Sequence, residues 1–138
     1  MIEFSIPGKP TAKARARSSW KGGKVQHYTP GKTAAYESTV ALFGSQAMGG
    51  KPPLDGPLMV HITAHMPIPA SWSKKKQAMA SDGDLLPTSR PDLDNIIKAV
   101  KDGLNEICWH DDSQIVSVIA HKIYGDKPMV EVSVSFAD

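Results

Sequence analysis

Apolar and polar residues alternate in three stretches of the chain, and this period of two predicts β-strands. The stretches cover residues 2–6, 58–66 and 130–136. A fourth run, over residues 115–123, is rich in β-branched side chains, which favour strands. Near the N-terminus, two adjacent glycines separate a basic segment from a return strand over 25–28, which predicts a hairpin.

Other segments repeat their apolar residues at helical spacing. The clearest helix is predicted over residues 95–108, with further helices over 33–48 and, as a shorter element, over 71–80. We expect residues 125–128 to join the last two strands as a hairpin. This succession predicts a single α+β domain over residues 1–138, in which helices pack on a mixed or antiparallel β-sheet.

Charge is distributed unevenly along the 138 residues, although the net charge is only +2. Residues 1–32 carry seven basic side chains and one acidic one, whereas residues 33–138 are net acidic. This asymmetry predicts a polyanion-binding N-terminal arm on an acidic body, and the alternative is a solvated lysine-rich face. Residues 67–90, rich in proline and lysine, suggest a mobile insertion. The candidate phosphate-binding residues are Lys13, Arg15, Arg17, Lys74, Lys75 and Lys76.

Several classes of protein are disfavoured by composition. No apolar run approaches the roughly 18 residues that cross a bilayer, and the N-terminus lacks the pattern of a secretory signal. We therefore expect a cytoplasmic protein. Cys108 is the only cysteine, which excludes an intrachain disulfide and cysteine-based zinc sites, and we expect it to be buried. We expect His61, His65 and His110 to be surface residues, with metal binding as the alternative for the first two and a supporting place beside the acidic site for His110.

The most informative segment begins at Pro91. Proline favours an extended entry, in which Asp92 and Asp94 project to one side and Leu93 to the other. Asp94 is then expected to cap the helix, with Lys98 one turn further on. Two close carboxylates repel each other unless a cation lies between them, and hard divalent ions prefer carboxylate oxygens. The pattern favours Mg²⁺ or Mn²⁺, and the alternative is simple helix capping beside a solvated acid.

A second acidic pair, Asp111 and Asp112, follows the predicted helix. We expect the strand over 115–123 to carry this pair back towards the first, and an ordinary turn is the alternative. Trp109, just before the pair, is expected to support the site from the core. Trp20 lies among basic residues, where it could stack on an unpaired base or serve in packing.

Three motifs lie between residues 91 and 115. They are Asp92-Leu93-Asp94-Asn95 with Lys98, Asp102-Gly103-Leu104-Asn105, and Trp109-His110-Asp111-Asp112-Ser113-Gln114-Ile115. Together they resemble the RusA-type Holliday-junction resolvases, which are frequently phage-borne endodeoxyribonucleases. Pro7-Gly8-Lys9-Pro10 and Tyr28-Thr29-Pro30 are similar to longer members of that family. The resemblance covers most of the chain, and the sequence departs from compact members over 67–90.

The resemblance implies a homodimeric fold and Mg²⁺-dependent cleavage of four-way DNA junctions by paired nicks in recombination and repair. Asp92, Asp94 and Asp112 match the metal-binding catalytic acids, Lys98 matches the catalytic lysine, and Asp111 is a weaker candidate. No organic cofactor and no membrane partner are expected. The alternatives are a metal-dependent phosphoesterase acting on flaps, single strands or nucleotides, a non-catalytic DNA-junction-binding or architectural protein, and an inactive phage homologue.

Overall fold

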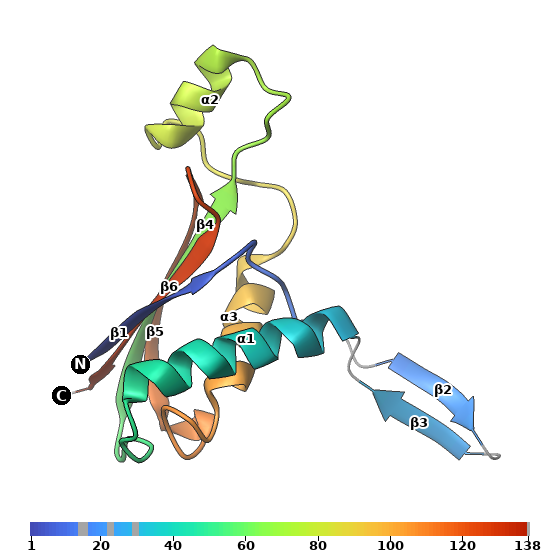
Figure 1. Ribbon diagram of the computed structural model, residues 1–138, viewed down its shortest axis with the longest axis vertical. Coiled ribbons are helices and arrows are strands. Elements are labelled where there is room, and N and C mark those ends of the chain that lie inside the picture. The colour runs from blue at the N-terminus through green and yellow to red at the C-terminus, as the bar shows by residue number, and fades with distance from the viewer. Residues whose placement is uncertain (14–16, 22–23, 29–30, 138) are drawn as a thin grey trace.

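A four-stranded mixed sheet with helices on one face forms the body of the molecule. The computed structural model describes residues 1–13, 17–21, 24–28 and 31–137, with the backbone alone for 17–21 and 24–28. The sheet has the order β1-β6-β4-β5 and a separate hairpin joins β2 and β3 (Figure 1). In chain order the elements are β1 (Ile2–Pro7), β2 (Arg17–Lys21), β3 (Lys24–Tyr28), α1 (Gly31–Met48), β4 (Leu58–Pro67), α2 (Lys74–Ser81), α3 (Leu93–Leu104), the 3-10 helix η1 (Asp112–Gln114), β5 (Ile115–Gly125) and β6 (Met129–Phe136). The predicted single α+β domain is confirmed.

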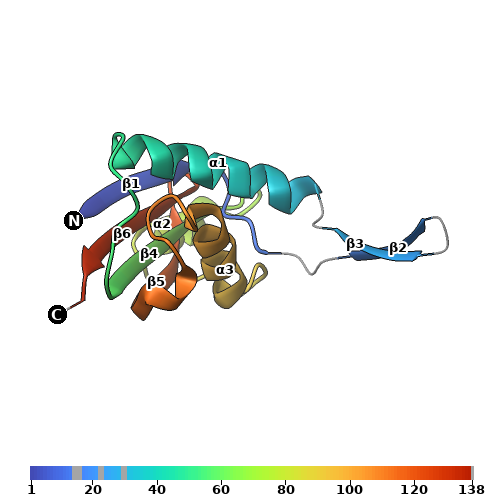
Figure 2. The same cartoon turned by 90° about the horizontal axis from the view of Figure 1, so that it is seen from below.

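The core lies between the sheet and the pair α1 and α3, which cover the same face (Figure 2). Alternate residues of β4 are buried against the helices, whereas those between them are more exposed, as the period of two requires. The two helices approach closely at Gly103, where an added Cβ would lie 2.7 Å from Val40 Cγ1. The position of α3 is therefore set by a small residue facing a β-branched one.

The predicted hairpin between the last two strands is wrong. β5 and β6 follow each other in the chain, but β4 lies between them, parallel to β5 and antiparallel to β6. The physical reason is burial: β4 supplies five buried side chains and needs a strand on each side, whereas much of β5 is exposed. β5 consequently forms an edge of the sheet.

The helices differ from the predictions mainly at their ends. α1 begins at Gly31, two residues earlier than expected. The short helix α2 is capped by Ser73, whose hydroxyl accepts a hydrogen bond from the Lys76 N–H at 3.2 Å. α3 begins at Leu93 and ends at Leu104, so it is shifted towards the N-terminus of the predicted span. In the part of the chain that the structure describes, no helix combines the length and the apolar character needed to cross a bilayer.

Residues 67–90 leave the sheet after β4 and carry α2 as a projection beyond it (Figure 1). The ring of Trp72 packs edge-on against Tyr124 of β5, with centroids 5.4 Å apart. The Ser81 hydroxyl contacts the carboxylate of Asp126 at 3.2 Å. These contacts attach the segment to the end of the sheet, and its predicted mobility stays a prediction.

Candidate active site at the start of α3

The start of α3 presents two of the predicted site residues on one helix face. Asp94 lies in the first turn, and Lys98 follows four residues later, which places both side chains over the same strip of the helix. Both are exposed. Negative charge is favoured at this end of a helix because the unpaired N–H groups carry partial positive charge. The first turn is therefore a favourable position for the Asp94 carboxylate.

Asp112 reaches the same place from a different part of the chain. It opens η1, immediately before β5, and its Oδ1 accepts a hydrogen bond of 2.8 Å from the indole Nε1 of Trp109. Trp109 is fully buried, so this bond ties the carboxylate to the core. As predicted, Trp109 supports from the core the turn that carries Asp111 and Asp112, which is called the acidic turn below.

A surface hollow of about 400 Å³ brings these groups together. It is lined by Asp94, Asn95, Ile97, Lys98, Lys101, Asp102 and Asp112. Three carboxylates, two from α3 and one from η1, thus share a solvent-accessible space with two lysines of α3. This hollow is called the acidic hollow below.

Asp92 lies outside the acidic hollow. It is the N-cap residue of α3, its side chain makes no capping hydrogen bond, and it lines a neighbouring hollow of about 510 Å³. Of the residues that the structure describes, Asn95 alone borders both hollows. The expected extended run with Asp92 and Asp94 on one side is wrong, because the helix already begins at Leu93 and successive helical residues turn by about 100°.

The neighbouring hollow is more basic than the acidic hollow. Besides Asp92, its charged lining residues are Lys9, Lys32 and Arg90. Both lysines belong to the basic N-terminal region. Among the residues that the structure describes, no three His, Cys, Asp or Glu side chains are grouped as a ready-made metal site. A divalent ion in the acidic hollow would therefore be held by no more than two of its carboxylates, with water or substrate completing the coordination.

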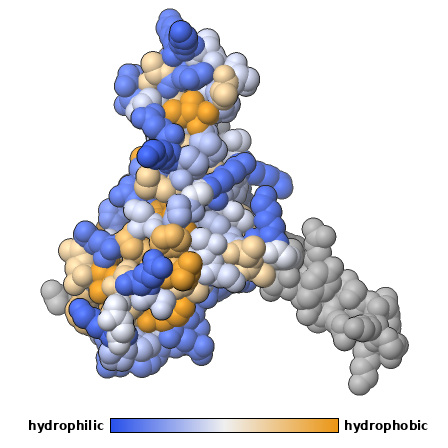
Figure 3. Space-filling model, viewed as in Figure 1, coloured by the Kyte–Doolittle hydropathy of each residue, from blue (hydrophilic) through white to orange (hydrophobic). Residues whose placement is uncertain are grey.

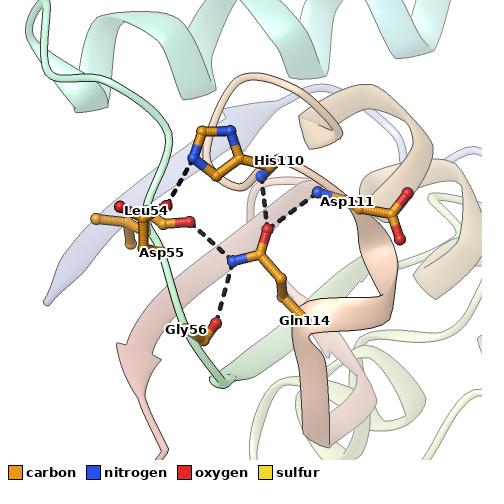
Figure 4. Close-up of polar contacts among 6 residues, drawn as sticks. All are labelled: Leu54, Asp55, Gly56, His110, Asp111 and Gln114. Atoms are coloured by element: carbon orange, nitrogen blue, oxygen red, sulfur yellow. Dashed lines mark hydrogen bonds and ion pairs between the residues drawn. The ribbon is translucent and has the colours of Figure 1, made fainter.

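Asp111 is held in a turn, in keeping with its weaker candidacy. Its carboxylate accepts a hydrogen bond of 2.9 Å from Ser113 N–H. Hydrogen bonds from the side chain of Ser113, and to a smaller extent from its backbone, lower the pKa of Asp111. The Gln114 side chain accepts bonds from the backbone N–H groups of His110 and Asp111 and donates to the carbonyls of Leu54 and Gly56 (Figure 4). Gln114 therefore fastens the acidic turn to the loop before β4.

Sequence reasoning missed this role of Gln114. The signal was present, since Asp111 and Gln114 have the spacing of a capping box, and both reciprocal bonds are formed. It also missed Lys101 and Asp102 as lining residues of the acidic hollow. Their spacing from Lys98, three and four residues, places them on its side of the helix.

Lys13, one of the predicted phosphate ligands, is engaged within the chain. Its Nζ lies 2.6 Å from Glu37 Oε1 of α1 and 3.2 Å from Asp102 Oδ2 of α3. Its backbone N–H donates a hydrogen bond of 2.9 Å to the backbone carbonyl of Asn95. The hydrogen bond with Glu37 is the main cause of its raised pKa. Lys13 thus anchors the base of the N-terminal arm beside the acidic hollow, and its contact with DNA stays a prediction.

The other predicted phosphate ligands fall into two groups. Lys74, Lys75 and Lys76 form the exposed first turn of α2, and Lys76 Nζ lies 4.0 Å from the centre of the Trp72 ring. Figure 3 shows mainly hydrophilic residues on this projection. Arg15 and the side chains of Arg17 and Trp20 lie outside the described part of the chain.

The remaining candidates have ordinary surroundings. His61 is exposed and its ring meets that of His121 at 5.8 Å, while His65 pairs with Glu131 on the face of the sheet opposite α1 and α3. His110 is exposed, and its Nε2 lies 2.9 Å from Asp55 Oδ1 (Figure 4). Cys108 is fully buried, and burial raises the pKa of its thiol to about 11.

Comparison with known proteins shows to which family the chain belongs. A protein from Bacillus subtilis (strain 168), the uncharacterized protein YqaN, is 39% identical over 135 residues, covering 96% of this chain and 94% of its own length. A crossover junction endodeoxyribonuclease, rusA, of Lactococcus phage r1t is 29% identical over 141 residues, covering 97% and 95%. The family model "Endodeoxyribonuclease RusA" matches residues 7–135. The chain therefore belongs to the RusA endodeoxyribonuclease family, a family of DNA-cleaving enzymes.

Proposed function

We propose that this protein is a Mg²⁺-dependent endonuclease that resolves four-way DNA junctions by paired, symmetric nicks as a cytoplasmic homodimer. The observation that carries the proposal is the acidic hollow, where Asp94, Lys98 and Asp112 meet in a chain of the RusA family. The phage relative, whose name states crossover junction cleavage, supports the choice of substrate. Since the described part of one chain brings these three residues together at one place, two cuts of equal geometry are most simply made by two copies.

The donor set of the acidic hollow fits magnesium. Mg²⁺ is usually held by one or two carboxylates and retains several waters, so Asp94 and Asp112 suffice as protein ligands. Asp92, which lines the neighbouring hollow and makes no capping bond, stays the predicted third acid. Mn²⁺ prefers the same oxygen ligands and is the expected substitute. When bound, the ion neutralises charge on the phosphate and lowers the pKa of a coordinated water.

The residues of this chain have separate tasks in that reaction. Lys98 places a positive charge one helical turn from Asp94, where it can stabilise negative charge that develops on the phosphate. The hydrogen bond from Trp109 holds Asp112 in one orientation, so that its carboxylate need not be ordered when substrate binds. The start of α3 adds a partial positive charge that favours a phosphate group nearby.

Binding to the phosphate backbone is assigned to two basic elements, the first turn of α2 and the N-terminal region. The α2 lysines are exposed, and Lys13 of the basic N-terminal arm lies beside α3. Phosphate contacts release counterions, so affinity should fall steeply as salt is raised. Recognition would then depend on the shape of the junction more than on base sequence.

The test is cleavage of a labelled synthetic four-way junction with and without Mg²⁺, followed by mapping of the nicks. We expect metal-dependent nicks at symmetric positions, no cleavage by Asp94→Asn or Asp112→Asn, and a large loss of rate for Lys98→Ala with junction binding retained. Lys51 is exposed in the loop between α1 and β4, so the Lys51→Ala variant is the matched control and should cleave normally. Equal cleavage of flaps, single strands and linear duplex would instead indicate a general nuclease, and binding without any cleavage would indicate an architectural or inactive protein.

A further inference from the structure

β5 leaves one long edge of the sheet open. This strand has 11 residues and pairs with β4 from Ile115 to Gly125. It is last in the sheet order, so its outer backbone groups have no neighbouring strand in the described chain. A long, unprotected edge is a template for pairing with another strand, and native proteins either protect such edges or use them.

The first half of β5 is also unusually apolar for an exposed strand. Val116, Val118 and Ile119 have relative exposures of 64%, 39% and 44%. Val116 and Val118 lie two residues apart and share one face, while Ile119 lies on the other. Exposed β-branched residues on both faces of an edge indicate a surface that is normally covered.

The second half of β5 is already in use. Lys122 Nζ donates to the carbonyls of Ser89 and Pro91 at 2.9 Å each, and Tyr124 packs against Trp72. The open part of the edge is therefore limited to residues 115–121. This length is close to the usual five or six residues of a strand.

The charge pattern identifies the occupant of this edge as a second copy. In an antiparallel pair around a two-fold axis, residues near the axis meet their own copies, so a charge there would face itself and repel. Residues 115–120 carry no charge. The opposite edge, β1, contains Glu3 and ends at Pro7, and both residues discourage strand pairing.

We propose that two copies of this chain pair antiparallel through residues 115–121 of β5 and form one continuous eight-stranded sheet. The two-fold axis of such a pair is perpendicular to the sheet, so the helical layers and both acidic hollows open on the same side. With the axis at Val118, the two Ile115 residues lie about 20 Å apart along the strands. Asp112 lies just before each β5, so the interface supports both acidic turns. The inference places the interface of the proposed homodimer at β5, and it rests on the proposed function.

The experiment measures mass in solution by light scattering and sedimentation velocity. We expect the wild type to be a dimer of the 14.9 kDa chain. Val118→Lys should reduce the mass to that of one chain with an unchanged circular dichroism spectrum, because two ammonium groups would meet at the axis. Leu42→Lys is the matched control: this residue of α1 is 54% exposed, and its substitution should leave the dimer intact.

Two further variants keep the test decisive if Val118→Lys folds poorly. Mixing Val118→Lys with Val118→Asp should restore a dimer that neither forms alone. Val118→Cys, a small change, should give a disulfide-linked dimer on oxidation, whereas Leu42→Cys should not, and the native Cys108 is buried.

The outcomes separate this inference from the proposed function. A monomeric wild type, a dimer that tolerates Val118→Lys, or equal disruption by Leu42→Lys would overturn the β5 interface, even if junctions are still cut. A β5 dimer that cuts no junction under any metal condition would overturn the proposed function and leave the interface standing.

Discussion

The bond between Trp109 and Asp112 predicts that two substitutions at one position have different effects on stability. Asp112→Ala leaves a buried indole N–H without a partner, and such a group costs about 1–3 kcal/mol. In a chain of this length about 4 °C of melting temperature corresponds to 1 kcal/mol, so the melting temperature should fall by about 4–12 °C. Asp112→Asn retains an oxygen acceptor and should cost less than about 1 kcal/mol.

Removal of a charge from the acidic hollow has an effect of its own, because Asp94 and Asp112 repel each other there. Asp94→Ala is the matched control, since it removes the same charge without exposing an unpaired indole. The difference in melting temperature between the two alanine variants isolates the hydrogen bond. Scanning fluorimetry in metal-free buffer measures it.

A double-mutant cycle with Trp109→Phe completes the test. The phenyl ring keeps most of the packing but has no donor, so Asp112→Ala should cost little more in that background. We expect a coupling free energy of about 1–2 kcal/mol from urea denaturation. A coupling near zero would refute the argument that the core orients Asp112 through this bond.

Three further predictions concern the frame of the site. Lys13→Ala should lower stability by about 1 kcal/mol, and the loss should shrink in 1 M salt because ion pairs are screened. Gly103→Ala should destabilise by about 1–3 kcal/mol in urea titrations, because its Cβ would overlap Val40. The Cys108 thiol has its pKa raised from 9.0 to about 11, so the unfolded chain loses this proton first. Unfolding free energy should therefore fall by on the order of 2 kcal/mol between pH 9 and 11, and Cys108→Ala should lack this component.

Local patterns predicted most elements and the chemistry of the site. The spacing of Asp94 and Lys98 placed them on one helix face, and the acidic pair before β5 indicated a second source of carboxylates. The order of the strands could not be predicted in this way. The three residues between β5 and β6 suit a tight turn, but whether two strands are neighbours depends on which strand has the most surface to bury, and β4 has more than β5.

The same limit applies to single side chains. Lys13 looks like a phosphate ligand because its neighbours in sequence are basic, yet its partners, Glu37 and Asp102, come from two helices far along the chain. Asp92 and Asp94 look like one pair, yet a helix that begins between them turns them into different hollows. The role of a charged side chain depends on partners that are distant in the sequence, and the neighbouring residues do not predict which partners these are.

The residues of the site have two kinds of role: some carry charge on the surface of the acidic hollow, and others hold those residues in place. Asp94 and Lys98 are exposed, so their substitution should alter DNA cleavage with little effect on folding. Trp109 and Gln114 do not line the acidic hollow. Trp109 orients Asp112, and Gln114 fastens the acidic turn to the loop before β4. Substitution of these two should therefore weaken stability and cleavage together. If β5 pairs with a second copy, the strand that follows the same turn is also held from outside, and the monomeric Val118→Lys variant should lose cleavage rate although its acidic residues are unchanged.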